Sequence, residues 1–397
     1  MRLKKFAAVL FLFILLSSSS YASDNVYITE PTFSPYSAGT VRREVLVEAL
    51  NELNYIRSLI GVPSVVLNDD YNNRAQHGAV LLDTINTLSH TPDKPRDMSE
   101  SFYKLAYDAT SHGNLSMGQK FINGVMSGNM SPVKAVKDCM DDSDSSNISR
   151  VGHRRWLMNP RMKKVGFGVS TRRGYAVTYV IEEFPGSSSR VLNQQEYQQY
   201  LQWKKWPVSK EYITWPASST PVEYFNKSTA WSITPNSDIF EKFSSVNVKL
   251  TRRRDGKTWN FGRNGNNGYF SIADSTVAYD QCIIFRPNNI GYQAGDSFTV
   301  EVSGLSRKNG GSGNISYNVA FTAGRTNART VTPATSSQTR QTNTSTNTSK
   351  KNTNTNTRTR KNTGTNTHWG NNQSGQSGSQ NTGNSPSNNS KYWGGGR

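Results

Sequence analysis

The sequence predicts a layered α/β domain, followed by an all-β sandwich and a disordered tail. Apolar residues recur at steps of three and four over 41–60 and about 70–88, which indicates amphipathic helices, and alternating runs follow over 163–183. From 209 to 324, short alternating runs are separated by turn-forming residues, which is typical of a sandwich of strands. The segment 325–397 is rich in Asn, Thr and Ser and has few apolar side chains to offset the entropy of ordering, so we expect disorder.

The first domain is predicted over 41–185. Its first helix is stopped by Gly61, and its second ends before the two prolines of the stretch SHTPDKP. A third and weaker helix is predicted over 131–140. The alternating run over 163–183 is broken at Gly174, which predicts two strands joined by a tight turn. Helices followed by a hairpin predict helices layered on a sheet.

The second domain is predicted over 209–324, as an immunoglobulin-like sandwich, after a Gln-rich linker over 186–208 that holds one short helix. Asp255-Gly256 lies between two alternating runs and predicts a hairpin. Alternation along this hairpin places Arg252 and Arg254 on one face, which we expect to lie in solvent. A contact with a polyanion is the alternative for these arginines.

The N-terminal residues 1–22 have the pattern of a signal peptide. A basic start is followed by an apolar run over 6–16 and by small polar residues that end at Ala22. The apolar run is too short to span a bilayer comfortably, and no later stretch approaches the roughly 20 apolar residues that a spanning helix needs. We therefore expect no transmembrane segment, and a chain that is secreted and extracellular or associated with the cell surface.

The formal net charge is +18, and it is concentrated in the tail. From Thr326 to Arg397 there are nine Lys and Arg residues and no acidic residue. The folded part keeps only a mild basic excess, which is not the footprint of a nucleic-acid-binding surface. We expect no nucleic acid as a partner, whereas the tail could bind an anionic envelope polymer.

Cysteine usage excludes a disulfide framework. The chain has two cysteines, Cys139 and Cys282, so its core must be stabilised by burial. We expect two buried free thiols, and a single bridge between them is the alternative.

Four motifs carry a family resemblance. In order, they read ALNELNYIRSLIGVPSVVLNDDYNNRAQHGAVLL, LSHTPD, GNLSMG and GHRRWLMNPRMKKVGFGV. In order and spacing they resemble the CAP superfamily of secreted proteins, which includes the cysteine-rich secretory, antigen five and pathogenesis-related proteins. The chain is similar to bacterial members, which lack the eukaryotic cysteines. The resemblance implies an α-β-α sandwich.

The resemblance also implies a cleft lined by two histidines and two acidic residues. The histidines correspond to His90 and His153. Where the family has a Gly-Glu-Asn motif, this chain has His112, Gly113 and Asn114, so the glutamate is missing. The second acidic position has no clean equivalent. The nearest acids precede the second histidine, at Asp141, Asp142 and Asp144.

These departures argue against catalysis. Two imidazoles hold a divalent metal weakly, because a zinc site normally draws three or four protein ligands. Without a positioned carboxylate there is also no evident general base. We therefore expect a non-catalytic binding protein with a degenerate cleft, whose ligand is a small apolar molecule, a glycan or a protein. The alternatives are a metal-dependent hydrolase, which needs an acid from elsewhere beside His90 and His153, and a surface-attached structural or adhesive protein.

One hypothesis for the cleft is a zinc site. If His112 turns inward, then His90, His112 and His153 supply three imidazoles with one open position. In the competing interpretation, His90 and His153 bond backbone and water while His112 caps a loop. The acidic run 141–147 lacks the glycine and the terminal glutamate of a calcium loop, so we expect it to be a solvated loop.

The remaining residues of the last motif are expected to support the fold. Trp156, Leu157 and Pro160 are predicted to pack around the second histidine. Arg154 and Arg155 are predicted to be exposed or ion-paired.

Overall fold

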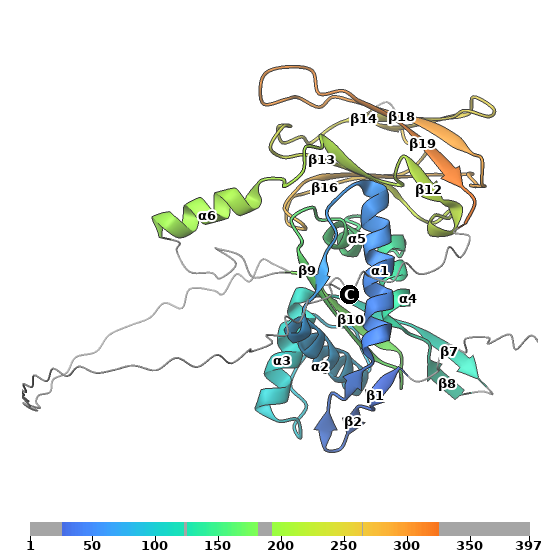
Figure 1. Cartoon of the computed structure of the whole chain (residues 1–397). Helices are drawn as coiled ribbons and strands as arrows, with labels where there is room; N and C mark the ends of the chain where they lie inside the picture. Colours follow the sequence, from blue (N-terminus) through green and yellow to red (C-terminus); the bar gives the residue numbers. More distant parts are fainter. Residues whose placement is uncertain (1–25, 123–124, 182–192, 264, 325–397) are drawn as a thin grey trace, which may run out of the picture. The chain divides into compact units, whose positions relative to one another are not determined.

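The computed structural model describes residues 26–122, 125–181, 193–263 and 265–324 (Figure 1). The predicted signal peptide and the predicted disordered tail both lie outside the described residues. Among the described helices, none is long and apolar enough to cross a membrane.

The first domain is built on a four-stranded sheet in the order β5-β9-β10-β6. Strand β5 pairs parallel to β9, and the other neighbours pair antiparallel. The strands are β5 (Val66–Leu67), β6 (Gly113–Met117), β9 (Lys164–Ser170) and β10 (Tyr175–Tyr179). The helices are α1 (Arg43–Ile60), α2 (Asp69–Ile85), α3 (Glu100–His112), α4 (Pro132–Asp141) and α5 (Gly152–Leu157). The predicted strand pair and its break are confirmed.

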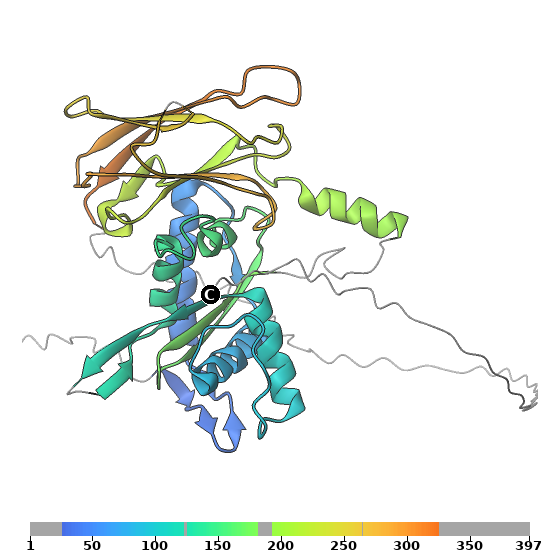
Figure 2. The same cartoon turned by 180° about the vertical axis from the view of Figure 1, so that it is seen from behind.

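Helices cover both faces of this sheet, which confirms the layered α/β prediction. Tyr175, Val177 and Tyr179 of β10 pack with residues of α2 and α3. The intervening Ala176 packs with residues of α1 and α4 in a second cluster. Alternation along β10 therefore places its side chains alternately in two helical layers. Figures 1 and 2 show the helices of these layers from opposite sides.

Two glycines in β9 allow α2 to lie directly against the strand. A Cβ on Gly166 would lie 2.3 Å from the carbonyl carbon of Tyr71, and one on Gly168 would lie 2.2 Å from that of Ala75. The alternating partner Phe167 faces the other layer, where it is buried with residues of α1 and α4. The run VGFGV thus combines a close helix contact on one face with apolar packing on the other.

Local signals account for the helix boundaries. Gly61 ends α1 in the left-handed conformation, with φ 66°. Asn86 caps α2 in the same way, so the helix ends at Ile85, three residues before the predicted end. Helix α4 begins at Pro132, and the side chain of Ser131 accepts a hydrogen bond from the backbone of Lys134.

Several short elements were not predicted. Helix α3 begins after Ser99, whose side chain accepts from the backbone of Phe102. Four N-terminal strands form two small pairs, β1 with β4 and β2 with β3, and a hairpin joins β7 to β8. Their bounds are β1 (Tyr27–Thr29), β2 (Thr32–Phe33), β3 (Tyr36–Ser37), β4 (Thr40–Val41), β7 (Gln119–Ile122) and β8 (Val125–Gly128).

The predicted short helix of the linker is present as α6 (Gln194–Lys204). Asn193 and Glu196 form a capping box at its start, in which each side chain bonds the other residue's backbone. The first part of the linker, up to residue 192, lies outside the described residues.

The β-domain consists of two sheets, in the orders β11-β13-β17-β16 and β12-β19-β18-β14-β15. All neighbours pair antiparallel except β12 and β19. Trp231 of the first sheet packs at 5.5 Å, ring centre to ring centre, on Phe298 of the second, so aromatic side chains fill the space between the sheets. The sheets are confirmed, and an immunoglobulin-like topology stays a prediction. The elements are β11 (Tyr212–Trp215), β12 (Ser219–Pro221), η1 (Val222–Tyr224), β13 (Trp231–Pro235), β14 (Asn247–Arg252), β15 (Thr258–Gly262), β16 (Gly268–Ala273), β17 (Cys282–Pro287), β18 (Ser297–Ser303) and β19 (Ile315–Thr322).

The hairpin at Asp255 is confirmed, and the predicted solvent face holds for Arg254, which is exposed, but is wrong for Arg252. Arg252 is 8% exposed, and its guanidinium donates to both carboxylate oxygens of Asp255 at 3.0 and 2.6 Å. Arg254 donates to the buried carboxylate of Asp296 at 2.7 Å. Arg252 is buried against Asp255, whereas Arg254 stays exposed while it donates to Asp296, and alternation along the strand reveals neither acid.

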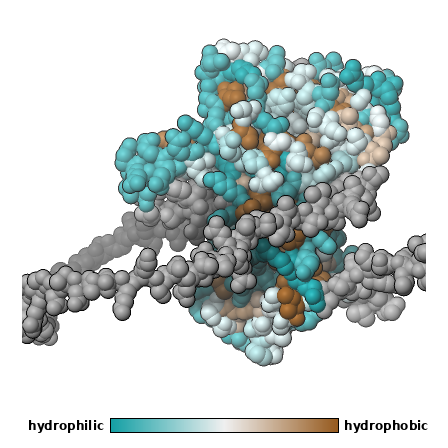
Figure 3. Space-filling model, in the orientation of Figure 1, coloured by the Kyte–Doolittle hydropathy of each residue, from teal (hydrophilic) through white to brown (hydrophobic). Residues whose placement is uncertain are grey.

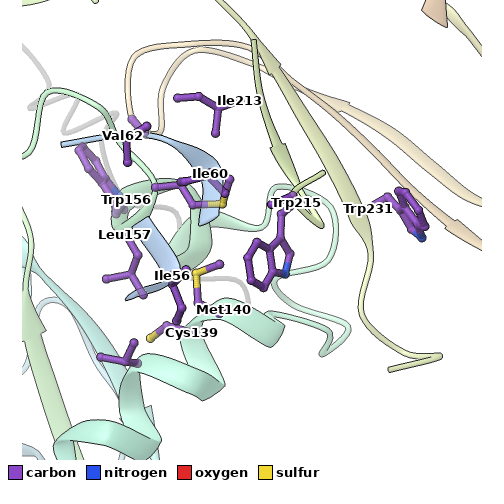
Figure 4. Close-up of a cluster of buried hydrophobic side chains, with 14 of the residues drawn as sticks. Ile56, Ile60, Val62, Cys139, Met140, Trp156, Leu157, Ile213, Trp215 and Trp231 are labelled. Atoms are coloured by element: carbon purple, nitrogen blue, oxygen red, sulfur yellow. The ribbon is translucent and has the colours of Figure 1, made fainter. Parts of the chain in front are cut away.

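The α/β domain and the β-domain share one apolar core. Ile60 and Trp156 of the first domain belong to the same buried cluster as Ile213 and Trp215 of the second (Figure 4). All the described residues fall in one compact unit. Their burial of apolar surface against each other therefore stabilises both domains.

The cysteine prediction is confirmed. Cys139 on α4 and Cys282 on β17 are both free and buried. Burial raises the pKa of the Cys139 thiol to about 12, against weaker opposing hydrogen bonds. Neither thiol is therefore poised to be a nucleophile at neutral pH.

Candidate functional site

His153 is held by a carboxylate that lies eleven residues earlier in the chain. Its Nδ1 lies 3.0 Å from Oδ1 of Asp142, whose side chain is fully buried, while the His153 side chain keeps 21% of its surface exposed. The other oxygen, Oδ2, accepts from the backbone N–H of Arg154 at 3.3 Å. Because Nδ1 of His153 is bonded to Asp142, Nε2 is the ring nitrogen that can bind a ligand.

Two residues in the left-handed conformation bring this pair together. Asp142 follows the last turn of α4 with φ 47°, and Val151 precedes α5 with φ 41°. A β-branched residue rarely adopts a positive φ, so Val151 stores backbone strain next to the histidine. Val151 is fully buried, so its packing can hold the backbone in this conformation.

The carboxylate of Asp142 raises the pKa of His153. Burial of the ring acts to lower the pKa, but the hydrogen bond and the charge of Asp142 outweigh burial and hold it above the usual 6.5. The imidazole therefore carries a positive charge over more of the neutral range than an ordinary histidine does. Arg150 opposes this effect through its own charge.

His90 lies in the loop after α2 and faces the same region. Its Nδ1 lies 2.7 Å from the carbonyl oxygen of Thr110. Burial lowers the pKa of His90, the hydrogen bond opposes this, and the charge of His153 lowers it further. The structure thus brings the two predicted histidines close enough to interact electrostatically, with opposite pKa shifts.

The predicted cleft residue Asn114 supports His153 through the backbone. It is 2% exposed on β6, and its Nδ2 donates to the carbonyl oxygen of His153 at 2.9 Å. The preceding Gly113 stands where the family glutamate would be. A Cβ there would lie 2.6 Å from Cγ1 of Val177 and 2.7 Å from the carbonyl oxygen of Ala109, so the fold leaves no space for a side chain at this position.

His112 does not join the other two histidines, which corrects the hypothesis of a His90, His112 and His153 zinc site. It lies in the last turn of α3, so its ring reaches back along the helix, with Nδ1 2.9 Å from the carbonyl oxygen of Asp108 and 3.2 Å from that residue's Oδ1. Its ring stacks on Tyr179 at 5.9 Å. Within the described ranges, no group of three or more His, Cys, Asp or Glu side chains is placed to hold a metal ion.

A hollow of about 560 Å³ lies between the loop that follows His90 and one face of α3. Tyr103 and Tyr107 line it with their rings 5.6 Å apart, and Tyr107 is 36% exposed. Asp93 and His112 add polar groups to the lining. No sequence motif points to these tyrosines; their spacing of four residues was the only available signal.

The acidic run before His153 serves the structure. Asp141 accepts hydrogen bonds from Asn226, at 3.3 Å, and from the hydroxyl of Thr229, both in the β-domain. Asp144 accepts from Ser146 and Asn147 within its own loop. The run therefore holds a turn and contacts the second domain, and only part of it is a solvated loop as predicted.

The arginines of the motif are buried, which corrects the prediction of exposed or ion-paired side chains. Arg154 is fully buried, and its guanidinium donates to three carbonyl oxygens: Met140 at 2.7 Å, Asp141 at 2.6 Å and Ala230 at 2.7 Å. Two of these carbonyls directly precede Asp142. Arg154 therefore fixes the turn that presents Asp142 to His153, and it also ties that turn to the β-domain.

Arg155 binds a second set of carbonyl oxygens. It donates at 2.7 Å to those of Asp274 and Val277 and also to that of Asp280. Arg161 donates to the buried carboxylate of Asp280 at 2.7 Å. Trp156 and Leu157 are buried in the apolar core, with Trp156 4% exposed; their predicted packing around His153 stays a prediction.

Comparison with known families agrees with this architecture. Residues 50–184 match the family model described as CAP, the cysteine-rich secretory protein family. This is the segment that carries α2, α3, the central sheet and the pair of Asp142 and His153. A search of curated proteins found no match.

Proposed function

We propose that the CAP domain formed by residues 50–184 is the ligand-binding part of a secreted, non-catalytic extracellular protein. The observation that carries this proposal is the hollow beside α3, whose lining includes the predicted cleft residue His112. Its volume of about 560 Å³ falls in the range of sites that hold small ligands, roughly 300–1,000 Å³.

The lining favours a glycan over the other ligand classes. Tyr103 and Tyr107 line the hollow with neighbouring rings, and Tyr107 is 36% exposed, which suits packing on the apolar face of a sugar ring. Asp93 and Lys104 are exposed in the same lining and can accept from and donate to hydroxyl groups. A purely apolar ligand would desolvate these charged groups without giving them a hydrogen-bond partner, at a cost in affinity.

The geometry of the histidine pair supports a non-catalytic role. Asp142 is fully buried and bonds the ring of His153 and the backbone N–H of Arg154, so it orients the ring and is not exposed to a substrate. Gly113 has no space for the carboxylate that the family places there. His153 is not in the lining of the hollow beside α3, so the histidine pair is a separate feature of the domain and the hollow carries the binding proposal.

Replacement of one exposed tyrosine tests the proposal. Tyr107→Ala removes a ring from the hollow, whereas Tyr197→Ala removes a tyrosine that is 46% exposed on α6 and does not line the hollow. We expect Tyr107→Ala to weaken binding to a panel of labelled oligosaccharides by about tenfold, since loss of an aromatic contact costs on the order of 1 kcal/mol or more. Equal binding by both variants, or no binding by the parent chain, would contradict the glycan proposal.

Hydrolysis is a second candidate, favoured by one observation. The Asp142 and His153 pair has the arrangement in which a carboxylate fixes the tautomer of a general base. The metal-dependent form fits less well, because the described residues supply two imidazoles and no third ligand. A hydrolase should lose all activity on His153→Ala, and a metal-dependent one also on chelation, whereas a binder keeps its ligand in chelator.

Attachment to the envelope is a compatible third role. It rests on the nine Lys and Arg residues and the absence of acids from Thr326 to Arg397. Electrostatic binding of this segment to an anionic polymer should be strong at low salt and lost at high salt. Deletion of 326–397 should abolish retention on the envelope under low-salt conditions only if this role is correct.

A further inference from the structure

A second hollow, of about 580 Å³, lies where the end of α6 meets the β-domain. Its lining shares no residue with the hollow beside α3. Four lysines line it, together with half-buried aromatic side chains such as Tyr279 and Phe243. The lysines are Lys204, Lys205, Lys242 and Lys308. We refer to this hollow as the lysine groove; the surface over α6 is hydrophilic in Figure 3.

The lysine groove has an excess of accessible positive charge. All four lysines are exposed. Of the acids in the lining, Asp280 is buried and its two oxygens already accept from Arg161 and from the indole of Trp206. Asp238 accepts from the backbone N–H of Trp206 at 2.8 Å, and Glu241 is exposed. Since the charge of Asp280 is compensated by Arg161, the exposed cations outnumber the remaining acids.

The end of α6 that carries two of the lysines is fixed in place. Trp203 packs edge-on against Tyr279, with ring centres 4.9 Å apart, and Arg161 donates to the carbonyl oxygen of Lys204 at 2.6 Å. Trp206 is 8% exposed directly after the helix. The ammonium groups therefore extend from an anchored backbone, which limits the entropy lost when they bind a ligand.

We propose that the lysine groove binds a segment of a linear polymer that bears repeated phosphate or carboxylate groups. Charge complementarity selects such a ligand, and the ring of Tyr279 gives its carbon backbone a surface to pack on. The chain's own tail cannot be the occupant, because from Thr326 onward it carries nine cationic residues and no acid. The tail and the groove would instead bind the same polymer at two points, which increases its overall affinity. This proposal does not depend on the glycan proposal for the hollow beside α3.

Protection of lysines from acetylation tests the proposal on the full chain. The chain is acetylated with and without polyphosphate, polygalacturonate or neutral dextran, and each lysine is quantified by mass spectrometry. We expect the four groove lysines to lose reactivity with at least one anionic polymer and to keep it with dextran. The polyphosphate and polygalacturonate arms distinguish phosphate from carboxylate as the preferred group. Protection confined to tail lysines such as Lys350 and Lys351, or no protection, would overturn the proposal.

A matched pair of double variants separates the groove from general electrostatics. Lys242→Gln with Lys308→Gln removes two groove charges, and Lys227→Gln with Lys249→Gln removes two exposed charges elsewhere on the β-domain. The groove variant should bind the protecting polymer on the order of fivefold more weakly and with a shallower salt dependence. The control variant should bind as the parent does. If both double variants bound the polymer equally weakly, binding would depend only on net charge, and the proposal of a specific groove would be wrong.

Discussion

Replacement of Arg154 by methionine should destabilise both domains together. Methionine keeps the apolar stem and much of the volume but removes the three hydrogen bonds to the carbonyl oxygens of Met140, Asp141 and Ala230 at 2.6 to 2.7 Å, and a longer one to the hydroxyl of Ser232. A hydrogen bond to a charged group contributes about 1.5–3 kcal/mol, and a buried carbonyl without a donor costs about 1–3 kcal/mol. Release of the buried guanidinium from desolvation offsets part of this loss, so we expect about 3–5 kcal/mol of lost stability.

Equilibrium unfolding in urea, followed by tryptophan fluorescence, measures this loss. Arg253→Met is the matched control, because the Arg253 side chain is exposed and such surface changes usually stay within about 0.5 kcal/mol. If Arg154→Met lost no more stability than Arg253→Met, the guanidinium would not be holding the two domains together.

Three further predictions follow from the same region. Asp142→Asn should lower the pKa of His153, which NMR titration measures. In the parent chain, the raised pKa stabilises the fold below pH 6.5, and this stabilisation is lost as the pH rises through the raised pKa. If the variant kept the same dependence of stability on pH, the pairing of Asp142 with His153 would be contradicted. Gly113→Ala should cost about 1–3 kcal/mol in thermal or urea unfolding, because its Cβ meets a side chain and a carbonyl closer than 3 Å, and a neutral result would show that the strand can shift. Cys139, with a pKa of about 12, and the buried Cys282 should react with a thiol reagent at pH 8 only after unfolding, and rapid labelling of the native chain would refute their burial.

The helices that the sequence predicts well are those with strong local signals. Helix α1 has a continuous apolar stripe and ends at Gly61, and α4 has Ser131 and Pro132 at its start. Helix α3 was missed because its buried stripe consists largely of small residues, including Ala106 and Ala109, which give a weak periodic signal. A close helix contact requires small residues, so the same feature that allows tight packing hides the helix from pattern analysis.

The candidate site was predictable only in part. The family motifs identify His90 and His153, and the structure places them near each other. The partner of His153 could not be chosen among three nearby acids. The pairing depends on left-handed conformations at Asp142 and Val151; all three candidates are Asp, and a β-branched valine gives no signal for a positive φ. The place of His112 in the motif suggests a zinc ligand. In the structure, the helical backbone instead directs its ring toward Asp108.

The partners of the two buried arginines could not be predicted from the sequence, and they indicate that the stability of the first domain depends on the β-domain. Arg154 and Arg155 are paired with carbonyl oxygens, which any residue can supply, and those from the β-domain lie at Ala230 and between Asp274 and Asp280, far along the chain. A fragment that ends at residue 181 would lose these acceptors and would expose the apolar cluster around Trp156. We therefore expect that fragment to unfold without a sharp transition, whereas the parent chain unfolds cooperatively in a thermal scan. A cooperative fragment with native-like stability would show that the CAP domain stands alone, and that the carbonyl contacts serve only to attach the β-domain.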